Sequence, residues 1–263
     1  MRLPAFDAVF RLTTGGAAIF ILILLFAMLL VLFRNAWPSI SRFGLGFLIS
    51  TEWNPVTSQF GALTTIVGTM VSTILAMLLS VPVAIGVAIF LTELSPASLR
   101  PVFGMAIELL AAIPSIIYGM WGLFVLAPIV SDYIQPFLGK YLGFLPLFQG
   151  PPMGIGMLTA GIVLAVMILP FMASIIRDVF LMTPRVLKES AYGLGATTWE
   201  VVSQVVLPYG IRGVIGGLLL GLGRALGETM AITFVIGNAH ELSLSLFAPG
   251  NTIASTLAKL YEG

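Results

Sequence analysis

Three charged side chains lie inside long apolar segments of this sequence, where charge is rare: Glu108, Arg224 and Glu228. Arg224 follows Arg212 by twelve residues, which is about 18 Å along a helix and places it near the middle of a bilayer. An arginine at that depth costs at least about 2.5 kcal/mol, so its default interpretation is functional. The guanidinium stays charged and presents several donors, which suits a tetrahedral oxyanion. We therefore predict that Arg224 attracts an anion and that Glu228 is its counter-ion or gate.

A stripe of glycines precedes these two charges in the segment 213–230, GVIGGLLLGLGRALGETM. Gly213, Gly217 and Gly221 recur every four residues, so they share one helix face, and Arg224 and Glu228 fall on that same face. Gly-x-x-x-Gly spacing allows close helix packing in a membrane. We predict helix packing for the glycines and a face turned toward protein or a water-filled path. The alternative is that the two charges form a structural pair that locks two helices together.

Glu108 is a further carboxylate within an apolar segment, about 12 Å along a helix from Arg100. It precedes the sequence AAIPS, where Pro114 frees a carbonyl and Ser115 could satisfy backbone groups. We predict a kink that opens a water-accessible cavity, with Glu108 in the substrate pathway and paired with Arg224 or another cation. The alternative is a protonated carboxylic acid that is hydrogen-bonded inside the helix bundle.

The composition around these residues belongs in a bilayer. Of the 263 residues, 59% are hydrophobic and 9% are charged, whereas soluble domains carry about 25% charged residues. The net charge of +1 argues for neither nucleic acid nor an acidic partner. The absence of Cys excludes disulfides and thiolate chemistry, and the single His240 makes a histidine metal site implausible. We predict no cofactor, no metal and no catalytic residue, because no nucleophile–base or metal-ligand constellation is present.

The apolar segments predict an all-α multi-pass membrane protein with a single transmembrane domain over residues 1–263. A span needs about 20 mostly apolar residues. Five segments qualify, at about 15–33, 62–91, 102–130, 153–176 and 211–236. Residues 34–60 and 131–152 have the composition of extramembrane loops. Residues 252–263 look like the start of a sixth helix that is too short to span, so we expect a C-terminal span to be missing.

The basic residues predict the orientation of the chain, because Lys and Arg favour the cytoplasmic side. With the N-terminus inside, three basic residues fall in outer segments: Arg34, Arg42 and Lys140. Seven fall in inner segments: Arg2, Arg11, Arg100, Arg177, Arg185, Lys188 and Arg212. We therefore expect the N-terminus in the cytoplasm, together with residues 177–210.

The polar segment 177–210 separates the fourth and fifth spans, and its core reads ESAYGLGATTWEVVSQVVLP. We expect two short helices there, joined at Gly193 or Gly195, with the second from about Thr198 to Val206 and ending before Pro208. The alternative is an ordinary polar loop with a glycine turn.

The spacing in this core resembles the cytoplasmic coupling motif of ATP-binding-cassette (ABC) importer permeases, E-A-A-x-x-x-G-x(9)-I-x-L-P. The matching residues are Glu189, Ala191, Gly195, Leu207 and Pro208, with Ser190 and Val205 as mild departures. Glu189 is the residue expected to dock, since an acidic side chain can meet an arginine of a partner. The sequence contains no G-x-x-x-x-G-K-[ST]. We therefore expect ATP hydrolysis in separate ATPase subunits and no enzymatic activity in this chain.

Two further stretches narrow the resemblance: ELLAAIPSIIYG at 108–119 and RALGETMAITFVIGN at 224–238. Together they resemble the permease subunit of phosphate-specific ABC importers, of the PstC type, over nearly the whole chain. The resemblance implies a MetI-like (type I) helical bundle in the bacterial cytoplasmic (inner) membrane that moves inorganic phosphate by alternating access. It also implies that Arg224 and Glu228 line the phosphate route and that 189–208 docks in an ATPase.

The partners that the resemblance implies are a second permease of the PstA type, two ATPase subunits and a periplasmic or lipid-anchored phosphate-binding protein. One alternative is the sister permease itself, or a permease for sulfate, molybdate or phosphonate. Another is a secondary transporter or channel that uses Arg224, Glu228 and Glu108 as an ion relay and needs no ATPase.

Overall fold

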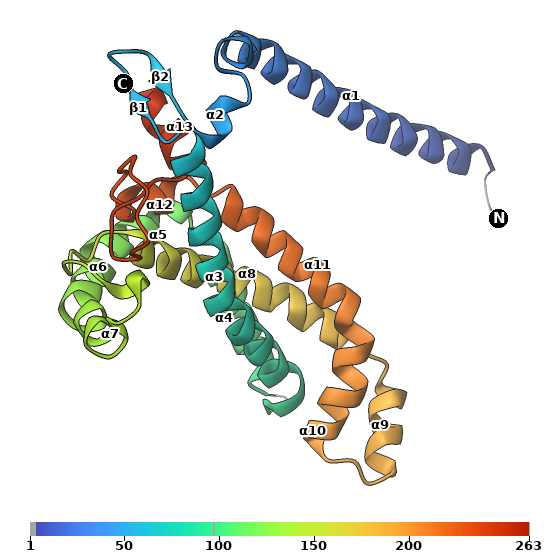
Figure 1. Cartoon of the computed structure of the whole chain (residues 1–263). Helices are drawn as coiled ribbons and strands as arrows, with labels where there is room; N and C mark the ends of the chain where they lie inside the picture. The colour runs from blue at the N-terminus through green and yellow to red at the C-terminus, as the bar shows by residue number, and fades with distance from the viewer. Residues whose placement is uncertain (1–3, 97, 263) are drawn as a thin grey trace. The chain divides into compact units, whose positions relative to one another are not determined.

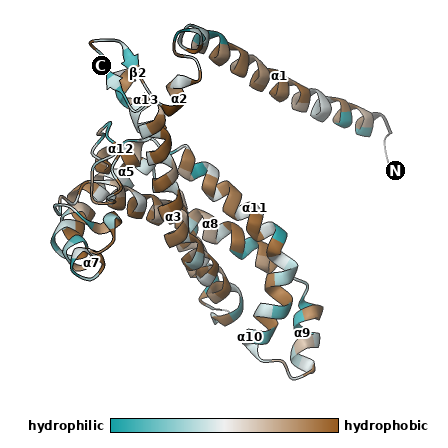
Figure 2. Cartoon of the chain, viewed as in Figure 1, coloured by the Kyte–Doolittle hydropathy of each residue, from teal (hydrophilic) through white to brown (hydrophobic). Residues whose placement is uncertain are grey.

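The computed structural model describes residues 4–96 and 98–262, and nearly all of its regular structure is helical (Figure 1). The chain divides into two compact units, residues 1–50 and residues 51–263. A single transmembrane domain over 1–263 stays a prediction. In the described residues, five helices are long and apolar enough to cross a membrane, and Figure 2 colours the chain by the hydropathy of each residue.

The first unit consists of α1 (Pro4–Phe43) and the short α2 (Gly46–Ile49). The apolar side chains of α1 are exposed, as lipid contact requires. The predicted span 15–33 lies inside α1, but residues 34–43, expected in a loop, continue the helix through Pro38. Their mixture of aromatic and basic residues is typical of a membrane interface. The composition of residues 34–43 thus indicates a membrane interface, but it does not show whether the segment is a helix or a loop.

The second unit is built around α8 (Met157–Leu181). In its most apolar window 67% of the residues are buried, against at most 33% in any other candidate span. It packs against α3 (Leu63–Ile89), which continues as a π-helical turn over Phe90–Leu94, and against α11 (Leu207–Leu226). The predicted second and fourth spans, 62–91 and 153–176, correspond to α3 and α8.

The third predicted span, 102–130, is wrong in its bounds. α4 (Arg100–Ala111) ends before Pro114, whose backbone is non-helical, and α5 (Ser115–Trp121) begins a new helix. That helix continues to Leu142 through a π-helical turn (Gly122–Leu126), α6 (Ala127–Ile129), a second π-helical turn (Val130–Ile134) and α7 (Gln135–Leu142). The loop expected over 131–152 therefore begins only after residue 142 and contains a 3₁₀ turn (Pro146–Phe148). The predicted kink is a complete break, because Pro114 donates no hydrogen bond and disfavours helix before it.

The fifth predicted span, 211–236, is also two helices. α10 (Thr198–Val201) runs through a π-helical turn (Val202–Val206) directly into α11, so no helix ends before Pro208. The π-helical turn loosens the hydrogen-bond ladder where proline has no N–H. α11 then ends at Leu226, and α12 (Met230–Val235) follows after a break.

The two ends of the second unit carry different elements (Figure 1). At one end lies α9 (Arg185–Gly193), next to α10. At the other end lie a hairpin of β1 (Trp53–Asn54) and β2 (Gln59–Phe60), and α13 (Ile253–Glu262). The backbone N–H of Ile253 in α13 donates to Thr69 Oγ1 of α3 at 3.0 Å. α3 thus connects the α9 end with the α13 end.

Candidate functional site

Arg224 lies near the C-terminal end of α11, half-buried. Its guanidinium carbon is 5.1 Å from the centroid of the Phe171 ring, close to the middle of α8. A cation over an aromatic face is stabilised without being neutralised. The ion pairs among the described residues join Arg177 to Glu108 and Asp178, and Lys188 to Glu93, so none involves Arg224. Within the residues that the structure describes, no carboxylate therefore contacts and neutralises the charge of Arg224.

Glu228 does not pair with Arg224, contrary to the predicted counter-ion and to the alternative of a structural lock. α11 ends between the two residues, so they do not share a continuous helix face. The Glu228 side chain is buried, and its Oε1 accepts a hydrogen bond from the N–H of Ala231 at 3.0 Å. Glu228 thus satisfies a free N–H in the first turn of α12. This hydrogen bond also explains the break that interrupts the predicted fifth span.

Glu108 forms an ion pair with Arg177 of α8 at 2.7 Å, and Arg177 also contacts Asp178 at 2.7 Å. Of the two partners considered for Glu108, the structure therefore has another arginine and not Arg224. The Arg177 side chain is 14% exposed, whereas the two carboxylates are 59% and 58% exposed. A cavity of about 360 Å³ lies against this cluster and is also lined by Arg100 and Gly104. A Cβ atom at Gly104 would be 2.6 Å from Arg177 Nη1, so a larger residue there would require the guanidinium to shift.

The glycine stripe of α11 lies against α8. A Cβ atom at Gly213 would be 2.7 Å from the Val179 methyl groups, and one at Gly217 would be 3.1 Å from Ile175 Cγ2. At Gly221 it would overlap the Met172 side chain. The stripe therefore permits the close approach of α11 to α8, and this approach holds Arg224 beside Phe171.

The α9 end contains the residues of the predicted coupling motif. The first predicted helix is present as α9, and Gly195 adopts φ +89°, which turns the chain toward α10. Thr197 caps α10 by a reciprocal pair of hydrogen bonds with Glu200. The sequence analysis missed this capping box, although T-x-x-E before an apolar run is its signature.

The motif residues divide between an inner and an outer side. Ala191 and Leu207 are partly buried against the core of the bundle. Glu189 and Pro208 are exposed, and so is Gly195. Four apolar side chains of α9, the turn after it and α10 are also exposed, by 44% to 91%: Val186, Tyr192, Leu194 and Trp199. We call Glu189 and these four residues the α9 platform. Exposed apolar residues rimmed by polar ones are typical of a protein interface.

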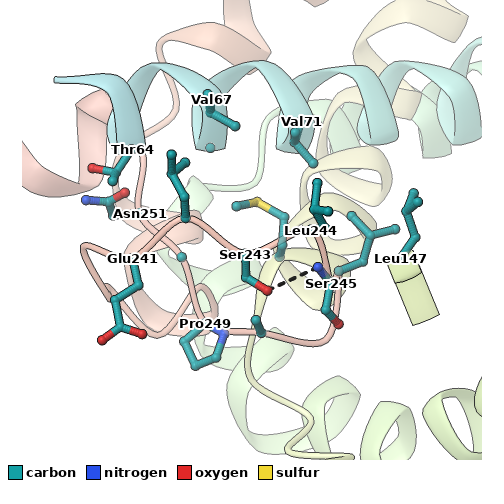
Figure 3. Close-up of a pocket in the computed structure, with 16 residues that line it drawn as sticks. Thr64, Val67, Val71, Leu147, Glu241, Ser243, Leu244, Ser245, Pro249 and Asn251 are labelled. Atoms are coloured by element: carbon teal, nitrogen blue, oxygen red, sulfur yellow. Dashed lines mark hydrogen bonds between the residues drawn. The ribbon is translucent and has the colours of Figure 1, made fainter. Parts of the chain in front are cut away.

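At the α13 end, a cavity of about 240 Å³ lies between α3 and the loop 241–251 (Figure 3). Val67 and Val71 line its α3 side, and Ser243, Leu244 and Ser245 line the loop side. The residues that line it include one charged side chain, Glu241, and no Lys or Arg. None of the predicted pathway residues lines this cavity, and its charge does not suit an anion.

Arg177 and Lys188 were counted only as inner charges, and the carboxylates Asp178 and Glu93 that contact them were not singled out from the sequence. A usable signal existed for Arg177, because a carboxylate within an apolar segment requires a cation and Arg177 ends another such segment.

Comparison with known proteins agrees with this architecture. Residues 80–258 match the family described as "Binding-protein-dependent transport system inner membrane component". The bundle from α3 to α13 is thus that of the membrane component of a transport system.

Curated relatives narrow this class. "Phosphate transport system permease protein PstC" of Mesorhizobium japonicum is 56% identical over 98% of this chain and 80% of its own length. The protein of that name from Pasteurella multocida is 56% identical over 97% of this chain and 81% of its own. A "Probable phosphate transport system permease protein PstC" of Methanocaldococcus jannaschii is 40% identical over 93% and 79%. The chain belongs to the PstC family of phosphate transport system permease proteins.

A solved structure titled "Inward facing conformations of the MetNI methionine ABC transporter: CY5 SeMet soak crystal form" aligns with 64% of this chain and 68% of its own. The TM-score is 0.44 and the identity 23%. The family membership and the helical architecture confirm the predicted fold class, an all-α multi-pass bundle of the importer-permease type.

Proposed function

We propose that this chain is a membrane-spanning half of an ABC importer and that inorganic phosphate crosses the bacterial inner membrane along it. The family membership supports the class and the substrate. One structural observation carries the assignment to a site, namely a half-buried Arg224 that no carboxylate contacts among the described residues. Such a cation offers a passing anion both its charge and its fork of donors.

In this proposal Arg224 is the anion-attracting group, beside the middle of α8. Its attraction must be moderate, because an anion held tightly would not leave. Glu228 also belongs to this pathway. Its hydrogen bond to the first turn of α12 stabilises the break between α11 and α12, and this break leaves Arg224 near a helix end. Glu108 belongs to it through Arg177, nearer the α9 end.

We further propose that the N-terminus and the α9 end are cytoplasmic, as the excess of basic residues in the inner segments favours. The α9 platform would then dock into an ATPase subunit, with Glu189 against a basic residue of that subunit. The other partners are a second permease of the PstA type, a second ATPase subunit and a periplasmic or lipid-anchored phosphate-binding protein. ATP binding would move α9 and open the permease pair outward to receive phosphate. ATP hydrolysis would then restore the inward-facing state. The chain itself performs no catalysis.

Phosphate uptake in a bacterial strain that lacks its own permease of this class tests the proposal. The strain is complemented with the wild-type chain, Arg224→Gln, Glu189→Ala and the control Lys140→Gln, which removes an exposed cation outside the proposed path. We expect wild type and control to restore uptake. Arg224→Gln should lose uptake but retain the ATPase, and Glu189→Ala should lose the co-purified ATPase.

The outcomes separate the rival functions. If the wild type binds an ATPase but restores no phosphate uptake, the substrate is another oxyanion, such as sulfate, molybdate or phosphonate. If no ATPase co-purifies with a transporting wild type, a secondary transporter replaces the importer.

A further inference from the structure

We propose that the ion pair between Lys188 and Glu93 is the mechanical link that transmits motion of α9 to the transmembrane bundle. This inference rests on the proposed coupling of α9 to an ATPase. Lys188 Nζ lies 2.5 Å from Glu93 Oε1. The pair joins α9 to the π-helical end of α3, 95 residues earlier in the chain.

Both side chains of the pair are largely shielded from solvent. The Glu93 side chain is 7% exposed and that of Lys188 is 17% exposed. Loss of one partner would leave an uncompensated charge in the bundle, so the contact resists separation. A surface ion pair would be weak and easily exchanged for water. A link that transmits displacement must stay closed under load, and burial provides that property.

Lys188 is the only side chain of α9, within the part of the chain that the structure describes, that forms a hydrogen bond or ion pair with another element. Its sequence neighbour Glu189 is exposed on the α9 platform. Adjacent residues of α9 are about 100° apart around the helix axis, so Lys188 can contact the bundle while Glu189 is available to a partner. A force applied to the platform is delivered to the bundle at Glu93.

The receiving end is itself held in place. The Arg100 Nε of α4 donates to the Ser95 carbonyl at 2.9 Å, directly after the π-helical turn that carries Glu93. From there α3 packs along α8, and α8 supplies Phe171 beneath Arg224. The contacts therefore run continuously from the α9 platform to the proposed anion site. We assign Lys188 and Glu93 as positioning residues of the transport cycle.

The test uses the complete importer in proteoliposomes with its phosphate-loaded binding protein. Lys188→Met and Glu93→Gln each break the charge pair, and Lys188→Glu with Glu93→Lys exchanges the two charges. Arg185→Met is the control, because it removes an exposed α9 cation without a partner among the described residues. The readouts are co-purified ATPase, ATP hydrolysis, and phosphate transported per ATP hydrolysed.

We expect both single variants to retain the ATPase and hydrolyse ATP, while phosphate transported per ATP falls about tenfold. The charge exchange should recover a large part of the loss, and Arg185→Met should match wild type. Glu93→Gln keeps an acceptor for the ammonium, so it serves as the test if Lys188→Met does not assemble.

Two results would overturn the inference. One is transport and hydrolysis that fall together in the single variants, with an unchanged ratio, which would make the pair merely structural. The other is a charge exchange that assembles without recovering the ratio. Failure of the proposed function is a separate result, because the wild-type importer would then transport no phosphate.

Discussion

Arg177 belongs to α8 and Arg224 of α11 lies against the same helix, yet the charges of the two arginines have different surroundings. Two carboxylates contact Arg177 at 2.7 Å, whereas Arg224 faces the ring of Phe171 and no carboxylate among the described residues. Arg177 is six residues beyond Phe171, about 9 Å along α8 toward the α9 end. A neutralised cation holds helices together, while an uncompensated one can attract an anion. Depth in the membrane alone therefore does not identify a transport residue. The carboxylates that contact each arginine must also be known.

The difference between the two arginines is removed most directly by placing a carboxylate next to Arg224. Phe171→Glu would place an acidic side chain where the aromatic ring now lies. The new carboxylate would pair with the guanidinium and compete with phosphate for it, so we expect phosphate uptake to fall on the order of 100-fold. Phe171→Leu, which adds no charge, should stay within a few-fold of wild type. Radioactive phosphate uptake measures both, and equal uptake by Phe171→Glu and Phe171→Leu would refute the role of an uncompensated Arg224.

The reverse change frees Arg177. Glu108→Gln with Asp178→Asn removes both counter-ions and leaves two uncompensated cations along the proposed path. A second attractive site should retain phosphate and slow its release, because conduction needs weak binding. We expect the maximal uptake rate to fall about tenfold while half-saturation shifts to lower phosphate concentration. Each single variant leaves one carboxylate on Arg177 and should change uptake less. A reduced rate with unchanged half-saturation would indicate that the cluster is only structural.

The helical class, the family and most span centres could be predicted, because apolar content and the coupling motif are local properties of the sequence. The positions of the helix breaks were harder to predict from the sequence. Apolar content is continuous across Pro114 and Gly227, so composition does not distinguish one span from two helices. The helical residues 34–43 and 131–142 were mistaken for loops for the related reason that interfacial helices and loops share a composition.

The ion pairs could not be predicted, because their partners are far apart in sequence. Glu108 and Arg177 are 69 residues apart, and Glu93 and Lys188 are 95 apart. Only the packing of α4 on α8 and of α9 on the end of α3 brings these residues together. Glu228 shows the opposite error, since its spacing from Arg224 suits a pair only if the helix continues. The helix ends at Leu226 instead.

The position of Arg224 depends on close packing, which Gly221→Ala would disturb. The added methyl would overlap Met172, whereas at Gly216 no atom lies within 4 Å of an added Cβ. We expect Gly221→Ala to lower stability by about 1–3 kcal/mol through overpacking. Gly216→Ala should be neutral or raise it by about 0.5–1 kcal/mol, because alanine favours helix. Thermal unfolding in detergent distinguishes them, since about 1 kcal/mol shifts the Tm of a chain of this size by roughly 2–4 °C. Equal Tm values would show that α11 can move away from α8 without loss.

A third cation, Lys259, lies at the α13 end, and its positive charge affects the pKa of His240. Burial, and secondarily the positive charge of Lys259, lower the pKa of His240 below its ordinary value of 6.5. The ring stacks on Trp53, with centroids 4.2 Å apart, and its Nδ1 lies 2.6 Å from Asn251 Nδ2. This contact fits a neutral imidazole whose Nδ1 accepts a hydrogen bond from the Asn251 amide. At a pH above the ordinary pKa, His240 is unprotonated in both the folded and the unfolded chain. It then adds no pH dependence to the stability of the folded state.

As the pH falls below about 6.5, the unfolded chain takes up this proton first, so His240 makes the folded state less stable until the folded pKa is passed. We expect the Tm to fall by a few degrees between about pH 7.5 and 5.5, and by less in Lys259→Met, which removes one of the two causes. His240→Gln should lose this part of the pH dependence. An identical Tm profile for wild type and His240→Gln would show that the imidazole is protonated equally in both states. Burial and the charge of Lys259 would then not lower the pKa of His240 in the folded state.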